Sequence, residues 1–216
     1  MTRALNTFLF DLDGTLIDSI ELILSSYRHT LAKHRGSVPP DEVWLAGVGT
    51  PLRAQFRQFT EDPAEIEELV STYTEHNLAN HDSLVREYPG VREAVLALAA
   101  DGVKLGVVTS KKRRGAGMGL ARGGFDGLFE VVVAADDVER HKPDPEPVTR
   151  AIELLGSAPA ETVFVGDSPY DLVAGRAAGV ATAAVAWGPF SRADLEAESP
   201  DYWVDDAAQL TSLGRD

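Results

Sequence analysis

Short apolar runs rich in β-branched residues recur along the chain and predict the strands of a buried sheet. Most of them are separated by stretches in which apolar residues recur at helical spacing. Strands that alternate with helices indicate right-handed crossovers and a parallel sheet with helices on both faces. The predicted strands are residues 7–10, 103–109, 131–134, 162–165 and 181–187, and the predicted helices are residues 91–100, 147–155 and 171–178.

Between the first two strands, residues 18–86 interrupt this alternation with a long helical segment. The segment is too long and too apolar for a loop, so we predict a small all-helical cap domain inserted after the first strand, over the carboxyl edge of the sheet. Residues 1–17 and 87–216 then form an α/β core domain with a Rossmann-like parallel sheet. The pattern of the cap consists of a stripe through Ile20, Ile23, Leu24, Tyr27 and Leu31, a short helix at 52–59, and a third helix that begins at Pro63.

The composition excludes several classes of function. The 216 residues carry a formal net charge of −14, and because binding to a phosphate backbone needs a basic surface, we expect no nucleic-acid partner. The absence of cysteine excludes disulfides and thiolate sites. No apolar run approaches the roughly 18 residues of a membrane span, and no signal-peptide pattern precedes Asp11, so we expect no membrane association and a cytoplasmic location. The sequence leaves the oligomeric state open.

Two carboxylates, Asp11 and Asp13, lie directly behind the first apolar run, and Gly14 and Thr15 then interrupt the strand. If the strand simply continued, both carboxylates would share one face. The carboxyl end of a strand in an open parallel sheet is where ligands bind. Two neighbouring like charges persist when a cation or a shared proton relieves them. The pattern therefore indicates a divalent metal ion together with an anionic substrate, and a phosphate fits both.

Chemistry-bearing residues also follow three later strands. Each has an ordinary structural explanation when taken alone, because a lone Asp after a strand is usually a helix cap and a lone Lys is usually exposed. Their conjunction is informative, because parallel topology brings all four strand ends to one crevice. The four sites are Asp11 with Asp13, Thr109 with Ser110, Lys142, and Asp167 with Asp171.

In this order and spacing, the four sites resemble the motifs of the haloacid dehalogenase-like phosphatase superfamily over nearly the full length of the chain. They read Asp11-Leu12-Asp13-Gly14-Thr15, Thr109, Lys142, and Gly166-Asp167-Ser168-Pro169-Tyr170-Asp171. The insertion after the first motif is similar to the helical cap of that superfamily. Within it, the chain is similar to the phosphoglycolate phosphatase group and looks closest to the bacterial inorganic pyrophosphatase branch. The segments that carry this closer likeness are 81–88, 136–139, 142–147 and 200–202.

The resemblance implies a role for each motif residue. Asp11 would attack phosphorus and form an aspartyl-phosphate, while Asp13 would act as general acid and then as general base. Mg²⁺ would be held by the Asp11 carboxylate, the main-chain carbonyl of Asp13 and Asp167, since a hard, oxygen-only ligand set suits Mg²⁺. Lys142 and Thr109 would bind the phosphoryl oxygens, together with main-chain N–H groups near Leu12 and Ser110. Asp171 would orient Lys142 or a metal-bound water.

The implied activity is therefore Mg²⁺-dependent hydrolysis of a small substrate, either inorganic pyrophosphate or a phosphomonoester such as 2-phosphoglycolate. We expect the turn-rich segment 47–51 to contact the leaving group and Arg53 to supply a cation for it, although an exposed helix-face arginine is an alternative. A dehalogenase, which usually lacks the second aspartate, and a phosphomutase, which places a histidine early in the first cap helix, are alternatives within the superfamily. A non-hydrolytic, phospho-accepting signalling or binding domain is an alternative of another class.

Overall fold

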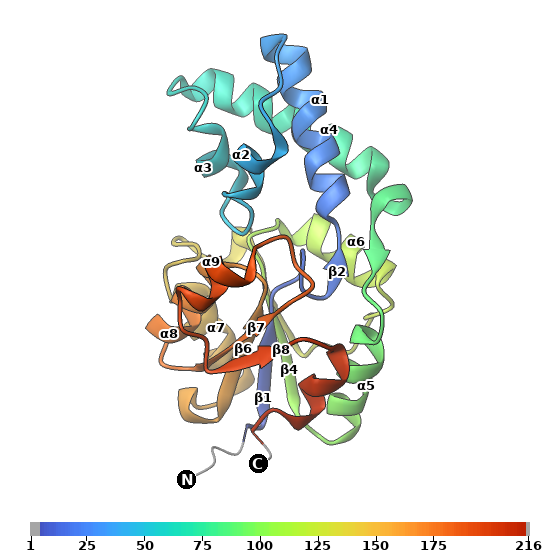
Figure 1. Cartoon of the computed structure of the whole chain (residues 1–216), viewed down its shortest axis with the longest axis vertical. Coiled ribbons are helices and arrows are strands. Elements are labelled where there is room, and N and C mark those ends of the chain that lie inside the picture. Colours follow the sequence, from blue (N-terminus) through green and yellow to red (C-terminus); the bar gives the residue numbers. More distant parts are fainter. Residues whose placement is uncertain (1–4, 215–216) are drawn as a thin grey trace.

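The computed structural model describes residues 5–214, and a six-stranded parallel sheet forms its centre (Figure 1). The strand order is β5-β4-β1-β6-β7-β8, so the first strand lies in the middle, between β4 and β6. This confirms the predicted α/β fold class. The strands are β1 (Thr7–Phe10), β4 (Lys104–Val108), β5 (Val131–Val133), β6 (Thr162–Gly166), β7 (Ala181–Val185) and β8 (Tyr202–Val204).

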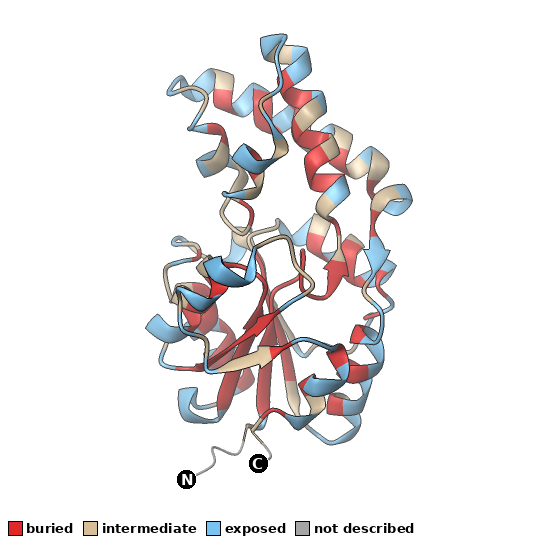
Figure 2. Cartoon of the chain, in the orientation of Figure 1, coloured by how far each residue is buried: buried red, intermediate tan, exposed pale blue. Residues whose placement is uncertain are grey.

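Helices cover both faces of this sheet, because successive side chains of each strand point to opposite sides. Phe8 and Phe10 of β1 pack into one cluster with residues of the helices α5 (Val91–Ala100) and α6 (Arg113–Arg122) and of the 3₁₀ helix η3 (Ala207–Ser212). Leu9 packs into the other cluster, with α7 (Glu146–Leu155) and α8 (Pro169–Ala177). The four inner strands are accordingly buried along most of their length, whereas two of the three residues in each edge strand, β5 and β8, are half-buried (Figure 2). The remaining short elements are η1 (Ala135–Asp137), η2 (Pro159–Glu161) and α9 (Arg192–Glu196).

The helical segment that follows β1 has a hydrophobic core of its own. Its helices stand beyond the end of the sheet, and the longest two, α1 and α4, pack against each other (Figure 1). An aromatic cluster around Tyr27, Trp44 and Phe56 fills the space between the helices. The chain enters and leaves this segment through the antiparallel pair β2 (Ile17–Asp18) and β3 (Arg86–Glu87), which contains the predicted domain boundaries. Its helices are α1 (Ile20–Arg35), α2 (Asp41–Leu45), α3 (Leu52–Phe56) and α4 (Pro63–Leu84).

Some element boundaries differ from those that the sequence predicts. The helix predicted at 52–59 ends at Phe56, the strand predicted at 181–187 ends at Val185, and the helix predicted from 171 begins at Pro169. The short strands β2, β3 and β8 and the helices α2, α6 and α9 were not predicted. Within the described chain, none of the helices combines the length and apolar character needed to cross a bilayer. Residues 1–4 and 215–216 of the predicted core domain lie outside the described range.

Candidate active site

The loop after β1 directs its two aspartates to different surroundings. Asp11 continues the pairing of β1, since its N–H donates to the Val165 carbonyl at 2.9 Å, and the residue is buried. The strand does not continue to Asp13, because Gly14 turns the chain with a φ of +89°. The Asp13 carboxylate is about 15% exposed, and its Oδ1 accepts hydrogen bonds from Ser19 Oγ and from Lys111 Nζ, both at 2.5 Å.

Gly14 also makes room for the acidic residue that follows β6. A Cβ at this position would overlap the carboxylate of Asp167, so both its φ and its surroundings favour glycine here. Thr15 Oγ donates to Asp167 Oδ1 at 2.5 Å. The other oxygen, Oδ2, is buried and has no hydrogen-bond partner within the described part of the chain. A buried carboxylate oxygen without a partner is costly, which suggests a ligand at this atom.

Lys142 connects two of the buried carboxylates. Its Nζ lies 2.9 Å from Asp11 Oδ1 and 2.6 Å from Asp171 Oδ1, and its side chain is about 1% exposed. Asp171 stands in the first turn of α8, where its Oδ2 accepts hydrogen bonds from the N–H and the hydroxyl of Ser168. Because both oxygens of Asp171 have protein partners, its carboxylate is fixed in place and holds the ammonium beside Asp11.

The charges of this cluster do not balance. Burial raises the pKa of Asp11 to about 7; the ammonium of Lys142 opposes the rise, and the carboxylates of Asp171 and Asp13 add to it. Burial, followed by the charges of Asp171 and Asp11, also raises the pKa of Asp167 well above its usual value. Burial alone would lower the pKa of Lys142, but Asp11 and Asp171 outweigh it and the pKa rises. Three buried carboxylates share one ammonium, so a further cation would relieve the repulsion.

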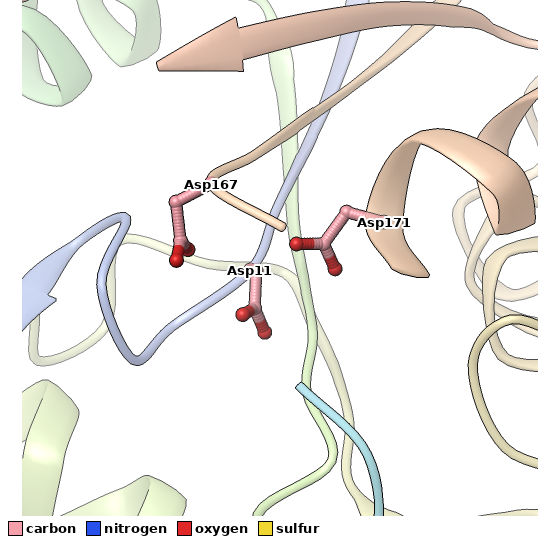
Figure 3. Close-up of side chains that lie close together, drawn as sticks. All are labelled: Asp11, Asp167 and Asp171. Carbon is pink, nitrogen blue, oxygen red and sulfur yellow. The ribbon is translucent and has the colours of Figure 1, made fainter. Parts of the chain in front are cut away.

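The residues present fit a hard divalent cation. Asp11, Asp167 and Asp171 each offer a carboxylate oxygen within 4.8 Å of the others, from the ends of β1 and β6 and from α8 (Figure 3). The oxygen of Asp167 without a partner and the oxygen-only donor set suit Mg²⁺ better than a soft metal ion. Asp171 is already occupied by Lys142 and Ser168, which favours Asp11 and Asp167 as the carboxylate ligands.

The second motif lies beside Asp11, at the end of β4. Thr109 is buried, and its Oγ accepts a hydrogen bond from the N–H of Lys111 at 3.1 Å. Ser110 Oγ donates to the carbonyl of Gly49 in the cap segment at 2.6 Å, so this hydroxyl joins the core to the cap. The side chain of Leu12 is fully buried, which leaves only its main chain to face a ligand.

A cavity of about 700 Å³ lies between the cap segment and the carboxyl end of the sheet. Its lining includes Asp11, Asp13, Thr109 and Ser110 from the core. Arg53 of α3 also lines the cavity, but Glu67 accepts two hydrogen bonds from its guanidinium group at 2.6 and 2.7 Å, and about 48% of its side chain is exposed. The structure thus brings together the predicted core residues, while Arg53 is engaged by a partner that the sequence did not indicate.

Two contacts at this site were missed by sequence reasoning. Lys111 follows the second motif directly and carries its ammonium to Asp13, but in the sequence it is only one member of the basic run 111–114. Its position next to Thr109 and Ser110 was the available signal. Ser19, which donates to Asp13, gave no sequence signal beyond its place before the first cap helix.

Comparison with known proteins gives consistent results. The family model described as haloacid dehalogenase-like hydrolase matches residues 8–185. Pyrophosphatase PpaX of Bacillus cereus (strain AH820) is 44% identical over 209 residues, which are 97% of this chain and 96% of that protein, and pyrophosphatase PpaX of Bacillus mycoides (strain KBAB4) is 45% identical over the same shares.

Solved structures agree with the sequence comparisons. A predicted phosphoglycolate phosphatase from Haemophilus somnus 129PT superposes with a TM-score of 0.85 at 25% identity, over 96% of this chain and 97% of that one. A structure from Bacteroides fragilis, whose name places it among the haloacid dehalogenase-like hydrolases, gives a TM-score of 0.90 at 27% identity, over 95% of this chain and 99% of that one. The resemblance expected from the four motifs is therefore confirmed, and the chain belongs to the haloacid dehalogenase-like hydrolase family.

Proposed function

We propose that this protein is a Mg²⁺-dependent phosphohydrolase that cleaves inorganic pyrophosphate through an aspartyl-phosphate on Asp11. The observation that carries the proposal is the contact between the buried Asp11 carboxylate and Lys142 Nζ at 2.9 Å, beside a cavity of about 700 Å³. A nucleophilic carboxylate and a fixed ammonium are the two groups that an anionic phosphoryl group needs at close range.

The chain's own residues divide the work. An Asp11 oxygen forms the bond to phosphorus, and Lys142, held by Asp171, neutralises the phosphoryl oxygens. Thr109 binds the same oxygens through its hydroxyl, together with main-chain N–H groups near Leu12 and Ser110. Asp13 also lines the cavity, where it protonates the leaving oxygen and then takes a proton from the water that hydrolyses the intermediate.

Mg²⁺ fits beside the same carboxylates. Asp11 and Asp167 would hold it, with the main-chain carbonyl of Asp13 as a third protein ligand. When bound, the ion would offset the buried negative charge and polarise the phosphoryl group. The oxygen of Asp167 that lacks a protein partner supports this assignment.

The choice of pyrophosphate rests on the relatives and on the cavity. Pyrophosphatases PpaX that match 97% of this chain at 44–45% identity support a phosphoanhydride substrate. The cations Arg53, Arg57, Lys111, Lys112 and Arg114 line the cavity and suit a leaving group that is itself anionic. A phosphomonoester such as 2-phosphoglycolate is the second candidate, supported by the likeness to the Haemophilus somnus protein at 25% identity.

The test is release of orthophosphate from pyrophosphate and from a panel of phosphomonoesters, ranked by kcat/KM with Mg²⁺ and with EDTA. We expect pyrophosphate to rank first, EDTA to abolish turnover, and acid quenching to trap phosphate on Asp11, detectable by mass spectrometry of the peptide. Preference for a phosphomonoester would refute the substrate assignment. Turnover without a trapped phosphoenzyme in any quench would refute the covalent mechanism, and isomerisation of a sugar phosphate without orthophosphate release would favour the mutase alternative.

A further inference from the structure

Lys111 is held in a fixed direction at the wall of the cavity. Its N–H donates to Thr109 Oγ at 3.1 Å, and its carbonyl accepts from the N–H of Ala135 at 3.0 Å, so its main chain is tied on both sides. Gly115, in the first turn of α6, leaves the space that its aliphatic chain occupies. A Cβ on Gly115 would lie 3.1–3.3 Å from three carbons of the Lys111 side chain. This packing directs the ammonium to Asp13, 2.5 Å away, and leaves the side chain about 13% exposed.

The other cations near Asp11 have different assignments. Lys142 is bound by Asp11 and Asp171 and is almost fully buried. Arg53 is paired with Glu67. Arg57, Lys112 and Arg114 also line the cavity but are exposed, and an exposed charge is screened by solvent. Lys111 is therefore the partly buried cation that lies next to the general acid.

The contact with Asp13 leaves Lys111 free to bind a second anion. An ammonium has three hydrogen-bond donors, and Asp13 uses one of them. Asp13 Oδ1 also accepts from Ser19 Oγ at 2.5 Å, so its carboxylate keeps a partner if Lys111 turns toward a substrate. After such a movement, both the Lys111 ammonium and the Asp13 carboxylate would still have a partner.

From these contacts, and resting on the proposed phosphohydrolase function, we propose that Lys111 is a specificity-determining residue that binds the leaving group and selects phosphate donors whose leaving group is anionic. With pyrophosphate, an Asp11 oxygen bonds to one phosphorus while the bond from that phosphorus to the bridging oxygen breaks. The electron pair stays on the bridging oxygen, which takes the proton from Asp13 and departs in orthophosphate. The other oxygens of this leaving group carry negative charge throughout the step, and Lys111, which lies next to Asp13, binds that charge. A neutral alcohol as leaving group offers Lys111 no comparable charge.

The test compares Lys111→Met, Lys111→Arg and wild type on two classes of donor at saturating Mg²⁺. Pyrophosphate and 2-phosphoglycolate have anionic leaving groups, and glycerol 2-phosphate has a neutral one. We expect Lys111→Met to lower kcat/KM about 100-fold for the anionic class and less than about fivefold for glycerol 2-phosphate, because removing one partner of a partly desolvated charge pair has an effect of this size. Lys111→Arg keeps the charge and should keep the preference for anionic leaving groups.

Arg113→Met is the matched control. It removes one positive charge from the same basic run, but its guanidinium pairs with Asp137, outside the cavity, so the ratio between the two classes should not change. Equal losses of Lys111→Met on both classes, with unfolding temperatures near that of wild type, would assign Lys111 a merely structural role and overturn the proposal. If wild type prefers 2-phosphoglycolate to pyrophosphate, the pyrophosphate assignment fails. The role of Lys111 is still decided by whether Lys111→Met lowers kcat/KM more for 2-phosphoglycolate than for glycerol 2-phosphate. A wild-type preference for glycerol 2-phosphate would overturn it as well.

Discussion

Replacing Asp11 by asparagine should stabilise the metal-free protein at alkaline pH while it abolishes turnover. Burial, opposed by Lys142, raises the pKa of Asp11 from 3.8 to about 7 in the folded protein. A carboxyl group whose pKa is raised on folding favours the folded state most below its unfolded pKa, and this contribution is lost as the pH rises toward the folded pKa. Above pH 7, the folded protein therefore carries a buried charge that the unfolded chain would leave in water.

The size of the effect follows from these two pKa values. Raising a pKa from 3.8 to about 7 corresponds to about 4 kcal/mol in the free energy of unfolding, of which about 3 kcal/mol is lost between pH 5 and pH 8. Asparagine is nearly isosteric and does not ionise, and Asp171 still pairs with the Lys142 ammonium at 2.6 Å. We therefore compare the free energy of unfolding of Asp11→Asn with that of wild type. If the other carboxylates keep their protonation states, this difference should shift by about 3 kcal/mol in favour of the variant between pH 5 and pH 8.

The assay is thermal unfolding in EDTA at several pH values between 5 and 8. For a chain of this length, about 3 kcal/mol corresponds to roughly 6–12 °C in unfolding temperature. Asp126→Asn, at an exposed loop position, is the control and should follow wild type at every pH. Adding Mg²⁺ should close the gap by stabilising wild type, by about 2.7 kcal/mol at 100 times the dissociation constant, and should stabilise Asp11→Asn much less.

A difference between Asp11→Asn and wild type that stays constant from pH 5 to pH 8 would refute the reasoning, because it would show that the Asp11 carboxylate ionises in the folded protein as easily as in the unfolded chain. A variant that is less stable than wild type at pH 8 would show that the ion pair with Lys142 outweighs the cost of burial.

Activity measurements on Asp11→Asn and three further variants test separate parts of the site. In steady-state assays, Asp11→Asn should retain less than about 1% of wild-type turnover, because the nucleophile is lost; activity above a few per cent would contradict covalent catalysis. Asp13→Asn should slow donors with poor leaving groups far more than p-nitrophenyl phosphate, whose leaving group needs no proton; equal losses would exclude Asp13 as the general acid. Arg53→Ala should change stability by less than about 1 kcal/mol, since its pair with Glu67 is exposed, and should raise KM for the true substrate only; an equal rise for all phosphate esters would exclude a specificity role. Gly14→Ala should lower stability by at least about 1–3 kcal/mol, because it strains a φ of +89° and collides with Asp167, and calorimetry should show weaker Mg²⁺ binding; an unchanged unfolding temperature would contradict the packing argument.

The sheet could be predicted from the sequence because its strands are short apolar runs that are buried on both faces. Residues 7–10 were predicted as a strand and are β1, with Phe8 and Phe10 on one side and Leu9 on the other. The acidic residues at the strand ends could be grouped for a similar reason, since parallel topology brings those ends to one edge. Asp11, Asp167 and Asp171 accordingly each offer a carboxylate oxygen within 4.8 Å of the other two.

Among the missed elements, α6 is one in which packing outweighs local propensity. Gly115, Gly117 and Gly119 give α6 a low helix propensity, yet the helix forms because small residues let it approach the loop after β1. A Cβ on Gly119 would lie 2.8 Å from the side chain of Ile17. The direction of the Asp13 side chain was also unpredictable, because it depends on the turn at Gly14 and on Lys111, a donor that lies far away in the sequence.

The position of the basic run also explains how a chain with a net charge of −14 can accept an anion. Charges separated by more than about 8–10 Å are largely screened at physiological ionic strength, so the net charge contributes little inside the cavity. Within a few ångströms, the cations that can meet an anion are Lys142 beside Asp11 and Lys111 beside Asp13. Each of these ammonium groups is held next to a carboxylate, so the pocket without substrate is not strongly positive. An incoming phosphate would then share the fixed ammonium of Lys142 with Asp11 and draw Lys111 away from Asp13, so each of these carboxylates needs another partner. Ser19 is that partner for Asp13, and Mg²⁺ would be that partner for Asp11.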